Sequence, residues 1–185
     1  MVLTASTLAP LGSPAPDFNL LEPLTGEHRS LSECSGSSGT VVMFICNHCP
    51  YVIHIKEELV RITADYQAKG IGFVAINSND VQSYPQDSPA KMIEYIQANG
   101  INFPYLFDQS QQVAKAYHAA CTPDFFLYDG NFKLVYRGQL DDSSPGNSEP
   151  VNGYALRNAI EALINHQPMP TEQKPSMGCN IKWKK

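Results

Sequence analysis

Cys46 and Cys49 are separated by two residues and lie where a strand-like pattern gives way to a helix-like one. Residues 41–45 are a continuous apolar run rich in β-branched side chains, which is typical of a strand buried on both faces. Apolar residues then recur at three- and four-residue steps from Val52 to Tyr66, as they do along an amphipathic helix. Strand, CxxC and helix in this order indicate a redox-active pair of thiols at a helix N-terminus.

The position at a helix N-terminus explains why such thiols are reactive. We expect Asn47 to cap the helix and Pro50 to lie in its first turn. Unpaired N–H groups and the helix dipole stabilise a thiolate, lowering a cysteine pKa from about 8.5 to roughly 3.5–7.5. Cys46, the more N-terminal and normally the more exposed thiol of such a pair, is the predicted nucleophile, and Cys49 is the predicted resolving thiol. His48 is a neighbour that favours the thiolate when protonated.

CxxC is also half of a zinc site, so metal binding is the alternative from a different functional class. A structural zinc site needs a second CxxC or an HxxxH pair, and neither follows in this sequence. A copper-chaperone module would use Cys46 and Cys49 with further ligands from His48, His54 or Cys121. Metal content of the purified protein separates this alternative from redox chemistry.

The whole chain of 185 residues is long enough for one full hydrophobic core. We expect a single domain over residues 1–185, with an extended N-terminal arm (1–16) and a C-terminal tail (166–185). The net charge of −5 and the lack of a Lys/Arg cluster predict no nucleic-acid partner. No basic, apolar leader and no run of membrane-spanning length are present, so we expect a cytoplasmic protein without a membrane partner.

The remaining pattern alternates strands and helices. The segment 71–77 reads as a second buried strand, which with 41–45 and the intervening helix makes a right-handed βαβ unit of parallel strands. The other expected elements are short strands at 17–21 and around 28–29, a helix from Ser88 to Gly100, a strand at 103–107, a helix at 111–118, an antiparallel hairpin at 121–138 and a final helix from Asn152.

This order resembles the thioredoxin superfamily. More narrowly, the chain is similar to thioredoxin-family proteins with an alkyl hydroperoxide reductase/thiol-specific antioxidant (peroxiredoxin-like) domain. The motifs that carry the resemblance are APDFNL at 15–20, CNHCP at 46–50, Thr122-Pro123, and GCNIKW at 178–183. The resemblance implies an α/β thioredoxin-like fold: a central mixed sheet flanked by helices, with an N-terminal β-hairpin extension and an extended C-terminal tail.

The resemblance also implies a function and further site residues. Pro123 matches the family's cis-proline, which packs beside the dithiol, and Thr122 would present its backbone to an incoming thiol or mixed disulfide. The activity implied is thiol–disulfide oxidoreduction with a disulfide- or dithiol-bearing partner. No bound cofactor is required, and we expect a monomer or weak homodimer.

Departures from the family pattern leave two questions open. Thioredoxins have Trp before the first cysteine and a buried carboxylate six residues upstream, where this chain has Ile45 and Thr40. Another base must then serve Cys49, and the reducing or oxidising direction stays open. Peroxiredoxins carry Thr or Ser three residues before, and Pro seven residues before, their reactive cysteine; Met43 and Gly39 stand there. Thiol peroxidase activity is therefore the second hypothesis rather than the first.

The other cysteines give less specific signals. Cys121, two residues before Pro123, is expected to be a small buried core residue, with a third redox role as the alternative. Cys179 lies in a tail that docks through Ile181 and Trp183, with a resolving role as the alternative. Cys34 is expected to be an exposed bystander.

Overall fold

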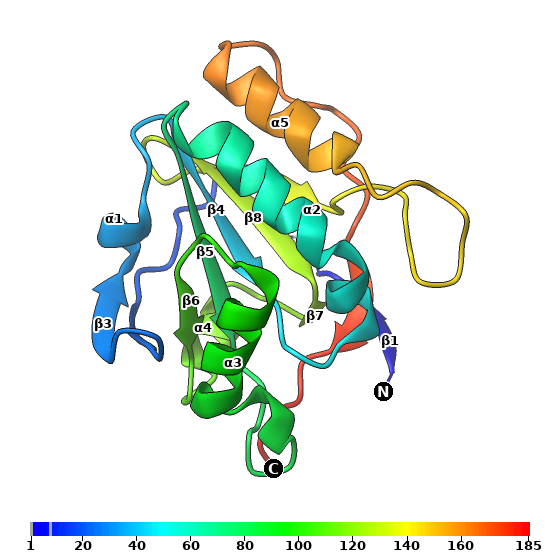
Figure 1. Ribbon diagram of the computed structural model, residues 1–185. Helices are drawn as coiled ribbons and strands as arrows, with labels where there is room; N and C mark the ends of the chain where they lie inside the picture. The colour runs from blue at the N-terminus through cyan, green and yellow to red at the C-terminus, as the bar shows by residue number, and fades with distance from the viewer. Residues whose placement is uncertain (1, 8) are drawn as a thin grey trace.

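A mixed sheet of seven strands forms the centre of the molecule, in the order β3-β2-β6-β5-β4-β8-β9. The computed structural model describes residues 2–7 and 9–185. Strand β4 (Gly39–Phe44) is buried along its whole length. It pairs in parallel with β5 (Ile71–Asn77) and antiparallel with β8 (Asp124–Asp129). The predicted βαβ unit and thioredoxin-like arrangement are confirmed (Figure 1).

Helices cover both faces of this sheet (Figure 1). Alternate residues of β4 point to opposite faces, so Val41 and Met43 join one core and Val42 and Phe44 the other. The first core is closed by α2 (Pro50–Gln67), α3 (Pro89–Asn99) and α5 (Tyr154–Ile164), and the second by α1 (Leu31–Cys34) and α4 (Gln112–Ala116). Cys34 contributes to the second core and is 6% exposed, so the expectation of an exposed bystander was wrong.

The remaining elements agree with the predicted order within a few residues. The Asp129-Gly130-Asn131 turn joins the predicted antiparallel hairpin, and Gly100 ends α3 in the left-handed conformation that favours glycine. No helix among residues 2–7 and 9–185 is long and apolar enough to span a bilayer. The remaining predicted strands are β2 (Asn19–Glu22), β3 (Glu27–Ser30), β6 (Tyr105–Phe107) and β9 (Leu134–Gly138), and a 3₁₀ turn η1 (Pro85–Asp87) that was not predicted precedes α3.

A second, three-stranded sheet joins the two ends of the chain to the predicted site. Its order is β1 (Leu3–Ala5), β10 (Met177–Asn180) and β7 (Cys121–Thr122), all antiparallel. The N-terminal arm and C-terminal tail, expected to be extended, thus each contribute a strand. As Figure 1 shows, this places the tail across the end of the central sheet where β4 leads into α2.

Candidate active site

The loop between β4 and α2 carries the CxxC motif. Helix α2 begins at Pro50, with Cys49 as its N-cap residue, so the prediction that Asn47 caps the helix was wrong. The Asn47 side chain instead donates to the Gln86 carbonyl at 2.9 Å and accepts from the Tyr105 hydroxyl at 3.0 Å. Cys49, rather than Cys46, is consequently the cysteine at the helix N-terminus.

Thr122 links the two cysteines to the cis-proline loop. The Thr122–Pro123 peptide bond is cis, as the resemblance implied. The Cys49 thiol donates to the Thr122 carbonyl at 3.1 Å, and the Thr122 hydroxyl lies 3.4 Å from Cys46 Sγ. Cys46 is 1% exposed and Cys49 0% exposed. The structure therefore brings four of the five predicted site residues into one buried cluster.

The two thiols ionise as a pair because a hydrogen bond joins them. Donation from the Cys46 thiol lowers the pKa of Cys49 to about 4 against the effect of burial, helped by Cys179, Thr122 and the Val52 N–H. The same hydrogen bond with Cys49, together with burial, raises the pKa of Cys46 well above its ordinary value. The dithiol thus loses one proton easily and holds the second.

The shared proton can lie on either sulfur. Donation from Cys49 to the Thr122 carbonyl requires the proton on Cys49, and the Thr122 hydroxyl can then donate to a Cys46 thiolate. With the proton on Cys46, the charge lies on Cys49 at the helix N-terminus. The assignment of Cys46 as nucleophile, which uses the first of these arrangements, stays a prediction.

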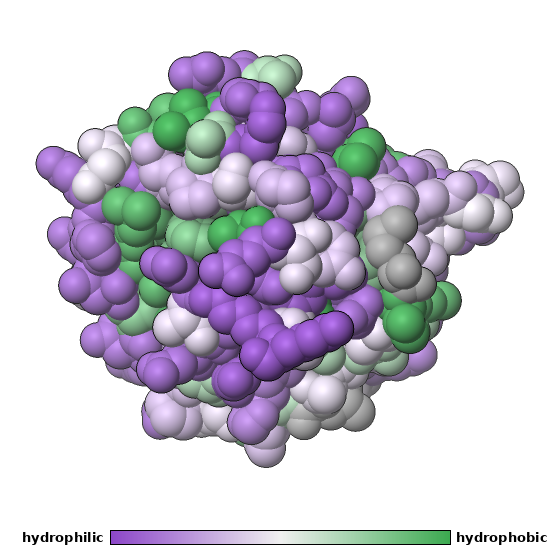
Figure 2. All heavy atoms as spheres, turned by 90° about the horizontal axis from the view of Figure 1, so that it is seen from below, coloured by the Kyte–Doolittle hydropathy of each residue, from purple (hydrophilic) through white to green (hydrophobic). Residues whose placement is uncertain are grey.

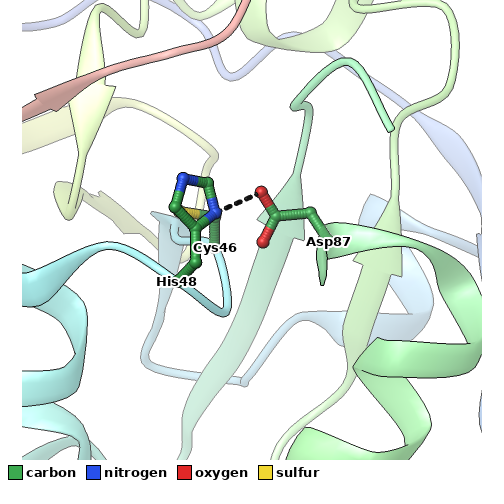
Figure 3. Close-up of side chains that lie close together, drawn as sticks. All are labelled: Cys46, His48 and Asp87. Carbon is green, nitrogen blue, oxygen red and sulfur yellow. Dashed lines mark ion pairs between the residues drawn. The ribbon is translucent and has the colours of Figure 1, made fainter. Parts of the chain in front are cut away.

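His48, the fifth predicted site residue, lies beside Cys46 and contacts a buried carboxylate (Figure 3). Its Nδ1 is 2.7 Å from Oδ2 of Asp87, which is fully buried. The imidazole ring also stacks on Tyr84, with ring centroids 5.6 Å apart and planes 8° from parallel. The carboxylate fixes the ring orientation, and a protonated His48 places a cation against the dithiol.

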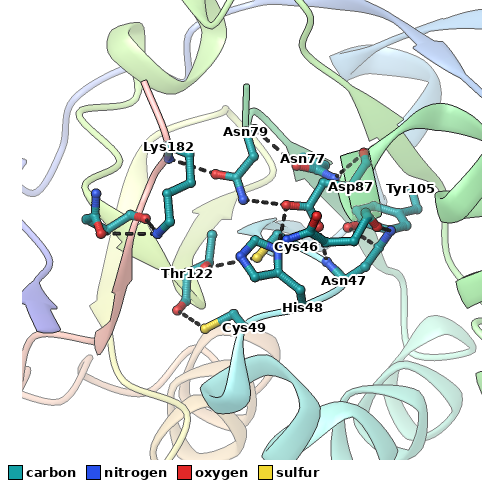
Figure 4. Close-up of polar contacts among 12 residues, drawn as sticks. Cys46, Asn47, His48, Cys49, Asn77, Asn79, Asp87, Tyr105, Thr122 and Lys182 are labelled. Carbon is teal, nitrogen blue, oxygen red and sulfur yellow. Dashed lines mark hydrogen bonds and ion pairs between the residues drawn. The ribbon is translucent and has the colours of Figure 1, made fainter. Parts of the chain in front are cut away.

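Asp87 also anchors a hydrogen-bond chain that runs to the C-terminal tail (Figure 4). It accepts from the Asn47 backbone N–H at 2.9 Å and from the Asn79 amide at 2.8 Å. Asn79 in turn accepts from the Lys182 backbone N–H at 2.8 Å. The CxxC loop, the segment after β5 and the tail are therefore held together by one carboxylate. Sequence reasoning missed Asp87; the signal available was that a histidine inside CxxC needs an acceptor to orient it.

We expect Asp87→Asn to lower the free energy of unfolding by about 3–5 kcal/mol. The substitution removes the buried carboxylate that pairs with His48 and accepts hydrogen bonds from Asn47 and Asn79. Denaturant titration measures the change. Glu94→Gln is the matched control: Glu94 forms an exposed pair with Lys91 at 2.7 Å, and its loss is expected to cost less than about 1 kcal/mol. Equal losses in the two variants would contradict the anchoring role of Asp87.

Cys46, His48 and Asp87 also form the candidate metal set. Each offers one ligand atom, and these atoms lie within 4.8 Å of one another. A sulfur, a nitrogen and an oxygen donor suit zinc. The short contact between His48 and Asp87 already uses two of the three ligand atoms, however. A metal would have to replace that contact, so the geometry favours the dithiol chemistry.

Two of the three cysteines outside the motif, Cys121 and Cys179, lie on the three-stranded sheet. Cys179 hydrogen-bonds Cys49, and burial with this bond raises the pKa of Cys179 to about 12. Cys121 is buried, and its Sγ lies 3.6 Å from the Pro123 carbonyl. A further buried acid, Asp124, has its pKa raised to about 7 by desolvation. Burial, and after it the charge of Asp124, raises the pKa of Cys121. Cys179 belongs to the dithiol cluster, whereas Cys121 belongs to its surroundings.

A cavity of about 320 Å³ opens beside the cis-proline loop. Tyr51, Pro123 and Met177 line it, which places it between the start of α2, the loop and the tail. Figure 2 shows the face of the molecule that the tail crosses: it is mostly hydrophilic, with hydrophobic residues in small separate groups. The cavity therefore gives a partner a hollow beside the cis-proline loop.

Comparison with known proteins identifies the family. The AhpC/TSA family model matches residues 11–137, which includes the CxxC loop and the cis-proline loop. The chain belongs to the AhpC/TSA family. The curated relatives include the thiol-disulfide oxidoreductase ResA of Geobacillus kaustophilus, 33% identical over 142 residues that cover 74% of this chain and 75% of the relative.

Solved structures similar to this chain include one near and one more distant relative. A conserved protein of Geobacillus kaustophilus is 52% identical, with a TM-score of 0.98 over 100% of this chain and 97% of its own. A structure titled as a thiol:disulfide interchange protein DsbE, from Chlorobium tepidum, is 26% identical with a TM-score of 0.65 over 84% of this chain and 98% of its own.

Proposed function

We propose that this protein is a thiol–disulfide oxidoreductase that acts through Cys46 and Cys49. The observation that carries the proposal is the hydrogen-bonded dithiol against the cis-proline loop, in which the pKa of Cys49 is lowered to about 4. Relatives named as thiol-disulfide oxidoreductases support it. A readily formed thiolate beside a second thiol is what disulfide exchange requires.

The reaction follows from the position of each group. The Cys46 thiolate attacks a partner disulfide, forms a mixed disulfide and releases one partner thiolate. Cys49 then attacks Cys46 Sγ, which forms the Cys46–Cys49 disulfide and releases the second partner thiolate. His48 supplies a cation beside the reacting sulfurs when it is protonated, and the Thr122 hydroxyl lies within reach of Cys46. The reverse sequence oxidises a partner dithiol.

The proposal includes the partner and the setting. The partner is a protein or small molecule that carries a disulfide or a dithiol. Neither a nucleic acid nor a membrane is a proposed partner. We propose a cytoplasmic protein that is a monomer or weak homodimer. The predominantly hydrophilic face in Figure 2 supports the weak self-association. Stabilising the thiolate also stabilises the reduced form and makes the couple more oxidising. Equilibration with glutathione buffers measures the reduction potential and so gives the direction.

An insulin-reduction assay with dithiothreitol as electron source tests the function. The wild-type protein is expected to accelerate insulin precipitation, and Cys46→Ser is expected to reduce the rate to background because the nucleophile is gone. Cys34→Ser is the matched control, because Cys34 is also buried but lies in the opposite core. Acceleration that survives in Cys46→Ser would contradict the proposal.

Peroxide reduction is the second candidate, favoured by membership of the AhpC/TSA family. The hydroxyl that a peroxidatic site needs beside the cysteine is absent from position 43, yet the Thr122 hydroxyl lies 3.4 Å from Cys46 Sγ. An antioxidant role belongs to this candidate. Hydrogen peroxide consumption at stoichiometric enzyme, compared between wild type and Thr122→Val, distinguishes it from disulfide exchange alone.

A further inference from the structure

Strand β10 occupies the edge of the cis-proline loop with a cysteine facing the dithiol. Cys179 lies directly opposite Thr122 in the antiparallel register. Directly opposed residues project from the same face of a sheet with Cβ atoms about 4.5–5.5 Å apart. The Thr122 hydroxyl is 3.4 Å from Cys46 Sγ, so this shared face is the one that meets the redox pair.

The close approach of β10 is built into the backbone. A Cβ atom placed on Gly178 would lie 2.0 Å from the Thr122 carbonyl oxygen and 3.2 Å from Cδ of Pro123. Glycine therefore lets the tail lie against the loop that also accepts the Cys49 thiol. Cys179 is 5% exposed and belongs to the same buried cluster as Cys46 and Cys49. A side-chain hydrogen bond joins it to Cys49.

We propose that Cys179 is a third redox residue, which takes over the disulfide by forming a Cys49–Cys179 bond. This inference rests on the proposed function, because the Cys46–Cys49 disulfide supplies the oxidising equivalents. Three sulfurs in one cluster, with Cys49 in the middle, allow the bond to move without a large change of fold.

The exchange balances in atoms and electrons. Cys179 sulfur attacks Cys49 Sγ, the Cys46–Cys49 bond breaks, the Cys49–Cys179 bond forms, and Cys46 leaves as a thiolate. The proton lost by Cys179 is taken up by Cys46, so no external oxidant or reductant is consumed. The product joins the tail covalently to the start of α2 and leaves Cys46 as a thiol.

Cys121 provides a matched control on the same small sheet. It pairs with Asn180, one position along from the Cys179–Thr122 pair, so its side chain projects from the other face. Its Sγ lies near the Pro123 and Ser176 carbonyls, at 3.6 and 3.9 Å. Cys121 is as buried as Cys179 but is not predicted to exchange with Cys49.

Disulfide mapping in full-length Cys46→Ser tests the inference. The variant is oxidised with diamide, quenched in acid, alkylated with N-ethylmaleimide and digested without reduction for mass spectrometry. A Cys49–Cys179 linked peptide is expected, unchanged in Cys46→Ser/Cys121→Ser and lost in Cys46→Ser/Cys179→Ser. In oxidised wild type, alkylation of Cys46 is expected and is lost in Cys179→Ser.

The outcomes separate this inference from the function on which it rests. A protein that reduces insulin but links Cys49 to Cys121, or leaves Cys179 fully alkylated after Cys49 is oxidised, overturns the inference and keeps the proposed function. Failure of wild type to reduce insulin counts against the proposed function, whatever the disulfide map shows. A Cys49–Cys179 link with Cys46 released in wild type supports both the role of Cys179 and the direction of exchange.

Discussion

Replacing Cys49 with serine is expected to turn a transient mixed disulfide into a stable one. In wild type, Cys49 is joined to Cys46 by a hydrogen bond and can attack its sulfur as soon as Cys46 is linked to a partner. Without that thiol the partner stays attached to Cys46 and turnover falls to background. Reaction with 5,5′-dithiobis(2-nitrobenzoate) measures this: wild type releases a second thionitrobenzoate in a fast phase, and Cys49→Ser does not.

The mass of the product identifies the trapped sulfur. Cys49→Ser is expected to carry one thionitrobenzoate on Cys46, and Cys46→Ser is expected to carry none there. Cys49→Ser/Cys179→Ser is the control for resolution by the tail: Cys179 contacts Cys49, so the double variant is expected to trap as stably as the single one. Rapid release from Cys49→Ser would show that Cys46 is not resolved by Cys49, and the order of attack would have to be reassigned.

The elements that carry the dithiol were predictable because their signals are local. A continuous apolar run becomes a buried strand at β4, and a three- and four-residue repeat becomes α2, whatever lies elsewhere in the chain. The helix start was misplaced because tertiary contacts outweigh capping preference. Asn47 is a better cap than Cys49 by residue type, yet its amide contacts Gln86 and Tyr105 instead.

Apart from Thr122 and Pro123, which the resemblance implied, the partners of the dithiol were not predictable because they come from distant segments with weak local patterns. Nothing near Asp87 in the sequence shows that it will meet His48, since the contact exists only after the segment following β5 folds against the CxxC loop. The tail likewise has no strand-like alternation around Gly178 and Cys179. Its pairing with β7 depends on the backbone contact that glycine permits, which is a property of the folded molecule.

The close approach of Gly178 to the Thr122 carbonyl gives the second large expected effect. In Gly178→Ala the new methyl group would overlap the Thr122 carbonyl, and both are attached to backbone that cannot rotate away. Crowding of this kind costs about 1–3 kcal/mol. Because one to two kcal/mol changes a population ratio by a factor of about 5–30, the open form of the tail should be at least several-fold more populated. Alkylation of Cys46, which is 1% exposed in the closed form, is expected to accelerate to the same extent.

Gly146→Ala is the control for this comparison, because a methyl group there would meet nothing within 4 Å. Its alkylation rate is expected to equal that of wild type, and both variants are expected to keep the cooperative unfolding of the central sheet. Since a partner disulfide must also reach Cys46, insulin reduction should rise with the alkylation rate in Gly178→Ala. A variant that alkylates no faster than wild type would show that the buried dithiol is reached by another route, and that β10 does not control access to it.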